Sequence, residues 1–296
     1  MTETVTLISV LIRTKNREIA LRRALDSVRN QTHHPIEVII VNDGDSFKKP
    51  VENHGFAKFV VHATKAGGRS DAANIALDNA TGKYCLFLDD DDEIAPNHLK
   101  WLAGALDNNP NIIAAYSKTK CIEAANYDNP IKIYDTPFDQ NQLILENFLP
   151  IHAVLFRRDA ATRIRFSPQL DIYEDWHFWL QLSSVGEFEQ IDIMTSIYHL
   201  DYSGIGAQAT KSYVEERKKF LKLAIPLLSE DQLLFLQYRA MSLFGEQQIS
   251  HELRLEIDAL KRENSSLLKR LNDVGLAGRF VSNLCRVFRG LIRRKR

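Results

Sequence analysis

The sequence predicts an α/β fold in which a mostly parallel sheet carries helices on both faces. Short apolar runs alternate with segments of helical periodicity from Val5 to Asp107, which is typical of parallel strands joined by helices. Four consecutive aspartates, Asp89 to Asp92, follow one of these runs. With 296 residues, 45% of them hydrophobic, the chain can bury a sizeable core. We therefore expect one enzyme-sized domain with an appendage.

The first half of the chain predicts four strands and three helices. Apolar, β-rich runs place the strands at Val5 to Ile12, Ile36 to Val41, Lys58 to His62 and Tyr84 to Leu88. Helical periodicity places the helices at Arg17 to Asn30, from Gly67-Gly68 through Leu77, and at Asn97 to Asp107. In sheets of this kind ligands bind beyond the carboxyl ends of the strands. The aspartates and Asp43 should therefore share one crevice.

The second half is less periodic. It predicts strands at Ile112 to Cys121, Ile131 to Tyr134, Ala153 to Phe156 and Ile191 to His199. It predicts helices at Asp139 to Phe148, Asp159 to Arg163, Glu174 to Val185 and Lys211 to Gln248.

The four aspartates favour a divalent cation. Like charges this close repel, and Mg²⁺ or Mn²⁺ prefers carboxylates together with substrate phosphate oxygens. The alternative is a solvated acidic loop or a helix start, because negative charge favours the first turn and Pro96 suits it. Capping is the expectation for Asp92 or Glu93, yet it does not explain four acids in a row. An EF-hand alignment fails, because Ile94 would fill the glycine position.

A heptad pattern marks the tail. Apolar residues from Leu253 to Val274 alternate steps of four and three, which predicts a coiled coil at 249–274 after a helical extension at 206–248. Asn264 falls at an a position, where a buried Asn favours a parallel two-stranded register. A parallel homodimer follows. An amphipathic helix docked on its own domain is the alternative.

The last segment, 275–296, combines large apolar residues on one face with seven positive charges. Every charged residue after Asp273 is basic. This composition is typical of a helix that lies on an anionic membrane surface. The formal net charge of the whole chain is zero, and we expect no nucleic-acid partner. The three cysteines are widely spaced, which suggests reduced thiols, and we expect a cytoplasmic protein that is peripheral on the inner face of the cell membrane.

Five segments in series carry a family resemblance. They are SVLIRTKNRE (residues 9–18), EVIIVNDGD (37–45), GGRSDAANIAL (67–77), GKYCLFLDDDD (82–92) and YEDWHFWLQL (173–182). Together they resemble the family 2 glycosyltransferases, inverting enzymes of the GT-A fold, whose sheet is a Rossmann-like nucleotide-binding sheet. The resemblance covers roughly Thr6 to Ser203, and it implies a glycosyltransferase domain at residues 1–205.

The resemblance implies a donor site for a nucleoside-diphosphate sugar, with a UDP-sugar as the first expectation. Asp43 would accept hydrogen bonds from the base or ribose, Thr14 would line the same pocket, and Asp89 would lie near the ribose. Asp91 would bind the Mn²⁺ or Mg²⁺ ion that bridges the diphosphate. Asp90 joins the donor-binding residues without a separate role. The alternative for each matched residue is a purely structural role in a turn, a loop or a helix cap.

The resemblance also implies a base. Asp175 would take the proton from the acceptor hydroxyl, and like-charge repulsion within the Glu174–Asp175 pair could raise the pKa of one member. Helix capping is the alternative for the pair. Trp176 and Trp179 flank the pair, and core packing is the expectation for Trp179.

The chain departs from the family pattern at two points. The family helix after the glycines carries Ala-Arg-Asn, and this chain has Ala73 where the arginine stands, so we assign Arg69 and Asn74 to donor binding. After the late strand, either His199 or Asp201 could complete the metal site, and we assign His199. His152 is expected to be a pocket-wall residue.

We therefore expect a metal-dependent inverting transferase that moves a sugar to a membrane-associated glycan or lipid-linked acceptor. The chain lacks the Gln-x-x-Arg-Trp motif and the apolar spans of processive members. The alternative is a noncatalytic, membrane-tethered dimerisation module with a degenerate fold.

Overall fold

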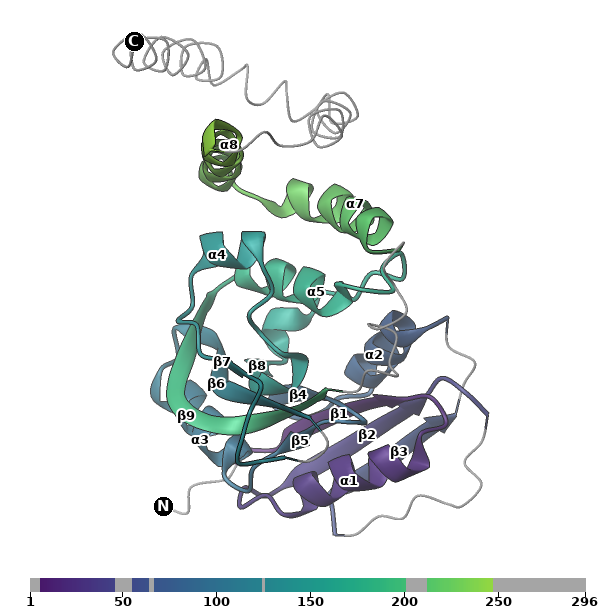
Figure 1. Ribbon diagram of the computed structural model, residues 1–296. Helices are drawn as coiled ribbons and strands as arrows, with labels where there is room; N and C mark the ends of the chain where they lie inside the picture. The colour runs from purple at the N-terminus through teal and green to yellow at the C-terminus, as the bar shows by residue number, and fades with distance from the viewer. Residues whose placement is uncertain (1–5, 46–54, 64–66, 124–125, 201–211, 247–296) are drawn as a thin grey trace, which may run out of the picture. The chain divides into compact units, whose positions relative to one another are not determined.

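The computed structural model in Figure 1 describes residues 6–45, 55–63, 67–123, 126–200 and 212–246. The chain divides into two compact units, residues 1–224 and 225–296. Helix α8 (Glu230–Glu246) belongs to the second unit. The predictions for Asp201, for the coiled coil at 249–274 and for the basic helix at 275–296 lie outside the described residues. No described helix is long and apolar enough to cross a bilayer.

One nine-stranded sheet runs through the described part of the first unit. Its order is β3-β2-β1-β4-β8-β6-β9-β5, with β7 paired to β6. The strands are β1 (Ile8–Thr14), β2 (Ile36–Asn42), β3 (Lys58–Ala63), β4 (Tyr84–Asp89), β5 (Glu93–Ile94), β6 (Ile112–Glu123), β7 (Lys132–Tyr134), β8 (Val154–Arg157) and β9 (Glu187–Leu200). As predicted, the strand that carries the aspartates is central and buried.

The sheet is parallel from β3 through β2 and β1 to β4. Beyond β4 it is mixed, because β8 runs antiparallel to both β4 and β6, while β6 and β9 are parallel to each other. Parallel neighbours need a crossover that returns the chain to the same end of the sheet. The segment before β8 instead brings the chain in at the opposite end.

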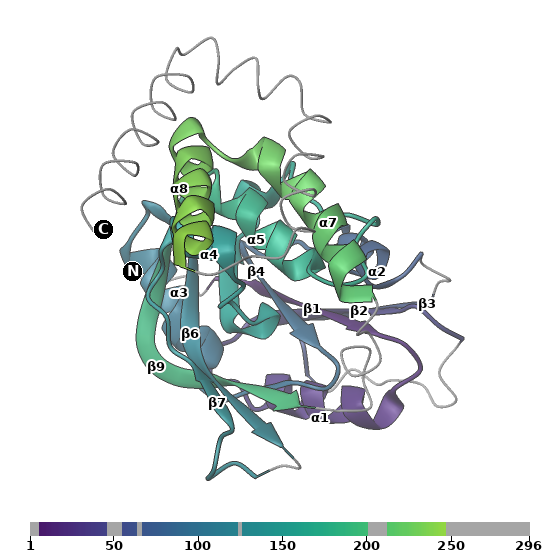
Figure 2. The ribbon, with the colours of Figure 1, turned by 45° about the horizontal axis from the view of Figure 1, so that its top comes forward.

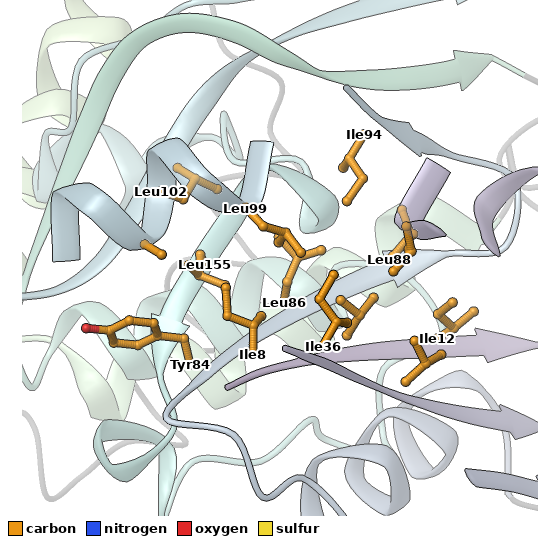
Figure 3. Close-up of a cluster of buried hydrophobic side chains, with 14 of the residues drawn as sticks. Ile8, Ile12, Ile36, Tyr84, Leu86, Leu88, Ile94, Leu99, Leu102 and Leu155 are labelled. Atoms are coloured by element: carbon orange, nitrogen blue, oxygen red, sulfur yellow. The ribbon is translucent and has the colours of Figure 1, made fainter. Parts of the chain in front are cut away.

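Helices cover both faces of the sheet, which confirms the predicted α/β fold. Figure 1 shows α1 (Glu18–Arg29) below the sheet and α2 (Arg69–Asp78) and α5 (Glu174–Ser183) above it. On the face of α1 and α3 (His98–Asn108), isoleucines and leucines of β1, β2 and β4 form a buried cluster with Leu99 and Leu102 (Figure 3). Each such side chain contributes about 1.5–3 kcal/mol when it is fully buried.

The opposite face has an aromatic core. Phe87 of β4 stacks on Phe156 of β8 and meets the rings of Phe166 and Phe178 edge-on. Trp179 is fully buried, as expected, and donates its indole N–H to Leu149 O at 3.1 Å. This core fixes α5 against the sheet and so determines where its first turn lies.

Three predicted helices differ from the structure, and the one predicted at Asp159 to Arg163 is a short 3₁₀ turn, Asp159–Ala161. The segment 211–248 is not one helix, because α7 (Ser212–Ala224) ends before a short 3₁₀ turn, Ile225–Leu227. Pro226 lies in that turn and has no backbone N–H to continue the helical hydrogen bonds. The helix predicted from Asp139 is only α4 (Gln140–Leu145), although Asp139 does cap it by accepting two backbone N–H groups.

Candidate active site

The carboxyl ends of β1, β2 and β4 meet at one edge of the sheet. The parallel register pairs Arg13 of β1 with Asp89 of β4, and Thr14 of β1 with Asn42 of β2. Asp43 follows β2 and donates its backbone N–H to Thr14 O at 2.9 Å. The sequence-predicted donor residues of three strands are thus brought to one edge, where ligands of open α/β sheets bind.

Arg13 is a buried arginine that joins two carboxylates, and sequence reasoning missed it. Its Nε lies 2.6 Å from Asp89 Oδ1, and its Nη1 lies 2.9 Å from Glu174 Oε1. Burial opposes the negative charge of Asp89, but the Arg13 guanidinium outweighs it and lowers the pKa of Asp89 to about 2. Asp89 and Glu174, which are far apart in the sequence, therefore lie against the same guanidinium.

Asp90 and Asp91 share a second arginine. Nη1 of Arg17 lies 2.9 Å from Asp90 Oδ1 and 2.8 Å from Asp91 Oδ2. Asp90 also accepts a hydrogen bond from the Thr14 hydroxyl. Burial nevertheless raises the pKa of Asp90 to about 6. The side chain of Asp91 is a quarter exposed and that of Arg17 is 42% exposed, so this ion pair is open to solvent.

Asp92 does not cap a helix, which corrects the sequence prediction. Its Oδ1 accepts the backbone N–H of His199 at 2.9 Å, and its Oδ2 lies 3.0 Å from His152 Nδ1, at ion-pair distance. The N-cap of α3 is Asn97 instead. An acid can lie this deep because a backbone amide and an imidazole surround it. His152, expected at a pocket wall, is buried beside Asp92.

The ring of His199 faces Glu93. Its Nε2 lies 2.6 Å from Glu93 Oε1, which also accepts a hydrogen bond from the Tyr127 hydroxyl at 2.9 Å. Glu93, the other candidate cap, therefore belongs to strand β5 and a polar network rather than to a helix start. Metal ligation by His199 stays a prediction.

A metal ion fits three of the aspartates. Asp89, Asp91 and Asp92 each offer a carboxylate oxygen, and these atoms lie within 4.8 Å of one another. This donor set suits Mg²⁺ or Mn²⁺, which prefer oxygen ligands. A cation that bound here would take the place of the Arg17 guanidinium on Asp91.

Asp43 is tied to the same edge from β2. It is 9% exposed, and its Oδ2 lies 3.5 Å from the Nζ of the exposed Lys15. The next residue, Gly44, lies so close to Asn16 that a Cβ atom would approach its side-chain oxygen to 2.4 Å. A larger residue at this position would have to displace the Asn16 side chain.

Glu174 and Asp175 begin α5 and have unlike partners. Glu174 is 2% exposed, and its Oε1 is 2.9 Å from Arg13 and 3.3 Å from Arg69 Nη1. Asp175 Oδ2 accepts a hydrogen bond from Asn147 Nδ2 at 3.0 Å. Burial, followed by repulsion from Glu174, raises the pKa of Asp175 to about 7. An acid of this kind can accept and release a proton near neutral pH.

The comparisons with known proteins assign the family. The family model described as "Glycosyl transferase family 2" matches residues 9–165, which is more than half of the chain. The chain is a family 2 glycosyltransferase. It is therefore a nucleotide-sugar-dependent transferase, and the resemblance found in the sequence is confirmed.

Relatives of this glycosyltransferase agree with the family. An uncharacterized glycosyltransferase of Haemophilus influenzae is 30% identical over 218 residues, covering 70% of this chain and 73% of the relative. The GalNAc(5)-diNAcBac-PP-undecaprenol beta-1,3-glucosyltransferase of Campylobacter jejuni is 33% identical over 101 residues, or 32% of this chain and 33% of that protein.

The GT-A fold is confirmed by similarity to S. aureus TarS 1–349. Its complex with UDP-GlcNAc superposes with a TM-score of 0.59 at 19% identity, covering 76% of this chain and 68% of that chain. Its complex with UDP gives a TM-score of 0.55 at 18% identity, covering 76% and 67%.

Two of the glycosyltransferase's predicted donor residues lie on α2. Arg69 pairs with Glu174, and its side chain is 39% exposed. The side-chain amide of Asn74 makes two hydrogen bonds to the backbone of Phe166. It donates to the carbonyl and accepts the N–H, each at 2.9 Å. Donor binding by Asn74 stays a prediction beside this packing role. Ala73 is fully buried, so the family's arginine position points into the core here.

The missed residue Arg13 does have a signal in the sequence. It is a charged residue that directly follows the apolar run Val10 to Ile12, and charged residues are rarely buried unless paired. The run predicts a buried strand, and a buried arginine requires carboxylate partners. Which carboxylates these are depends on the strand register, which the sequence alone does not specify.

Proposed function

We propose that this family 2 enzyme transfers a sugar with inversion, using Asp175 as the general base. The single observation that carries the proposal is that two adjacent acids have partners of different charge. Glu174 forms ion pairs with the guanidinium groups of Arg13 and Arg69, whereas Asp175 accepts a hydrogen bond from the neutral amide of Asn147. The charge of Glu174 is thus paired with two cations, and Asp175 is left able to take a proton.

The proposed reaction is one displacement. Asp175 accepts the proton of the acceptor hydroxyl as that oxygen attacks the anomeric carbon, and the nucleoside diphosphate leaves from the opposite face. The base needs a raised pKa to accept a proton near neutral pH, and burial supplies it. A single displacement inverts the anomeric configuration, which NMR of the product detects.

The proposed donor is a UDP-sugar held at the edge formed by β1, β2 and β4. Asp43 and Thr14 would contact the nucleoside, Asp89 would lie beside the ribose, and Asp90 would be among the donor-binding residues. Support comes from the structural neighbour TarS, which was solved with UDP and with UDP-GlcNAc. Asp91, together with Asp89 and Asp92, would hold Mn²⁺ or Mg²⁺. The bound cation would neutralise the diphosphate and make it a better leaving group.

A thermal-shift panel of nucleoside diphosphates with Mn²⁺ tests the donor, because a ligand that binds the folded state raises its melting temperature. UDP with Mn²⁺ should give the largest shift. Donor hydrolysis should require the metal and should be lost in Asp91→Ala. The matched control is Asp192→Ala, which removes an exposed acid from β9. Absence of metal-dependent turnover with any common nucleotide sugar would support the noncatalytic alternative.

The proposed acceptor is a membrane-associated glycan or a lipid-linked saccharide. Two observations support it: the basic, apolar composition of 275–296, and the lipid-linked substrate named for the Campylobacter jejuni relative. Deleting 276–296 should release the protein from vesicles that contain anionic lipid. Retention by those vesicles after the deletion would contradict the proposed anchor.

The proposed homodimer forms through the coiled coil at 249–274. A dimer would present two basic segments to the same membrane, and paired weak anchors bind more tightly than one. Replacing the a-position asparagine, Asn264→Leu, should loosen the preference for two chains. Sedimentation measures this, and an unaltered dimer would argue against the register.

A further inference from the structure

Helix α7 packs on the start of α5, the helix whose first turn carries Asp175 (Figure 2). The ring centroid of Phe220 on α7 lies 4.3 Å from that of Trp176 and 5.8 Å from that of Tyr173. The guanidinium carbon of Arg217 lies 4.3 Å from the Trp176 centroid and also over the other two rings. A stacked arginine of this kind is attracted to the ring faces.

Glu216 reaches from α7 into the turn before α5. It is 3% exposed, and its Oε2 accepts the backbone N–H groups of Asp171 at 3.0 Å and Ile172 at 3.3 Å. Its Oε1 binds Lys219 Nζ at 2.5 Å. Backbone N–H groups outside helices and strands need hydrogen-bond partners of their own. Here one side chain from another helix supplies a partner for both amides.

The turn ends on a strained residue. Tyr173 has φ 68° and ψ 14°, the left-handed conformation, directly before Glu174 and Asp175. A bulky residue with positive φ persists only where its surroundings hold it. The backbone of this residue sets the direction in which α5 begins, and so the direction in which its first-turn acids project.

The same turn is held from the other side by α2. Ser70 is 3% exposed, and its hydroxyl donates to Leu170 O at 3.2 Å. Ser70 lies in the first turn of α2, next to Arg69, which pairs with Glu174. The turn 170–173 is therefore fixed between a helix of the donor side and α7.

We propose that Glu216 and Arg217 are positioning residues that hold the turn 170–173 so that Asp175 faces the acceptor hydroxyl. The proposal rests on the role proposed for Asp175. A general base works within hydrogen-bond reach of the proton it takes, and a misplacement of about 1 Å costs roughly a hundredfold in rate. Turnover then depends on α7, a helix that comes after every strand of the sheet in the sequence.

Three variants of the full chain test the proposal. Glu216→Ala removes the acceptor of both amides, and Glu216→Gln keeps an oxygen that can accept them. Glu215→Ala is the matched control, because it removes the same charge from the neighbouring, exposed residue, which pairs with Lys218. The measurements are kcat and KM for UDP-GlcNAc hydrolysis with Mn²⁺, the melting temperature, and amide hydrogen exchange.

For Glu216→Ala we expect kcat to fall roughly 10- to 100-fold with little change in KM. Exchange should accelerate at the Asp171 and Ile172 amides and stay slow in β1. Glu216→Gln should recover most of kcat, and Glu215→Ala should match the wild type. If exchange accelerates everywhere and kcat falls only with the folded fraction, α7 merely stabilises the fold and the proposal is overturned. Unchanged kcat in a folded Glu216→Ala protein overturns it as well.

Failure of the proposed base is distinguishable from failure of this inference. Full turnover in Asp175→Asn would show that Asp175 is not the base. The exchange measurement would still report whether α7 holds the turn. Slow exchange at Asp171 and Ile172 in Glu216→Ala would show that α7 does not hold the turn, whatever residue acts as base.

Discussion

Two partly buried carboxylates of the site, Asp89 and Asp175, differ in what neutralises them. Asp89, at the end of β4, is held by the guanidinium of Arg13, and its pKa falls to about 2. Asp175, at the start of α5, accepts a hydrogen bond from the amide of Asn147, and its pKa rises to about 7. Both side chains are partly buried, so burial alone does not explain the difference. The partner decides whether a buried acid stays charged or takes up protons.

Glu174 makes this contrast possible. Arg13 and Arg69 form ion pairs with Glu174, whereas among the described residues Asp175 forms none, although both guanidinium groups act on it from farther away and lower its pKa. A donor site that holds a metal ion needs carboxylates that stay ionised. A general base must instead be a carboxylate that is not already paired with a cation. Arg13 therefore pairs with Asp89 directly, and it also affects Asp175 through its pairing with Glu174.

Asp175→Asn should have the largest effect. The amide keeps the shape of the side chain but cannot accept the proton, so kcat should fall about 10²- to 10⁴-fold. Nucleotide affinity should be largely unchanged, because the donor edge with Asp89 is untouched. Steady-state kinetics and a thermal shift with UDP and Mn²⁺ measure the two quantities. A large loss of nucleotide binding would mean that Asp175 is a structural residue.

Arg13→Met should have the next largest effect, on stability. It leaves Asp89 without its cation and removes one of the two cations that pair with the buried Glu174, and breaking a buried pair costs about 3–5 kcal/mol. Urea unfolding at pH 7 measures the change. Arg22→Met, on the exposed side of α1, is the matched control and should be nearly neutral. A neutral Arg13→Met would show that the two ends of the site are not linked through this residue.

The donor edge was the easier part to predict. Its acids end apolar strands, and parallel strands bring their carboxyl ends together, so the sequence alone places Asp43 near Asp89. The alternation of strands and helices likewise predicts the α/β fold, which the structure confirms. These inferences are local, because each depends on a short run of residues and its period.

The remaining features depend on contacts between distant segments. Arg13 meets Glu174, and Glu216 meets Asp171, only after the sheet and helices have packed. Asp92 looked like a helix cap because an acid and a proline precede a helix, yet His152 draws it inward. No periodic pattern in the sequence indicates which residues form such pairs, so the pairs can be identified only from the folded structure.

The pH dependence of transfer should separate the two acids. Because the pKa of Asp175 is raised to about 7, the base is ionised above that pH and protonated below it. The rate constant kcat/KM should therefore fall about tenfold per pH unit below 7. Asp89, with a pKa of about 2, stays ionised throughout this range. A flat profile from pH 5.5 to 8 would contradict the assignment of Asp175 as the base.

Asn147→Ala should give the smallest effect and the sharpest test of the contrast. Leu149 N–H donates to Asn147 Oδ1 at 3.1 Å, which turns Nδ2 toward Asp175. That amide favours the charged carboxylate, so its loss should raise the pKa of Asp175 and move the acid limb to higher pH by up to about one unit. Asn141→Ala, an exposed residue of α4, is the control. A limb that moves to lower pH would show that Asn147 does not stabilise the anion.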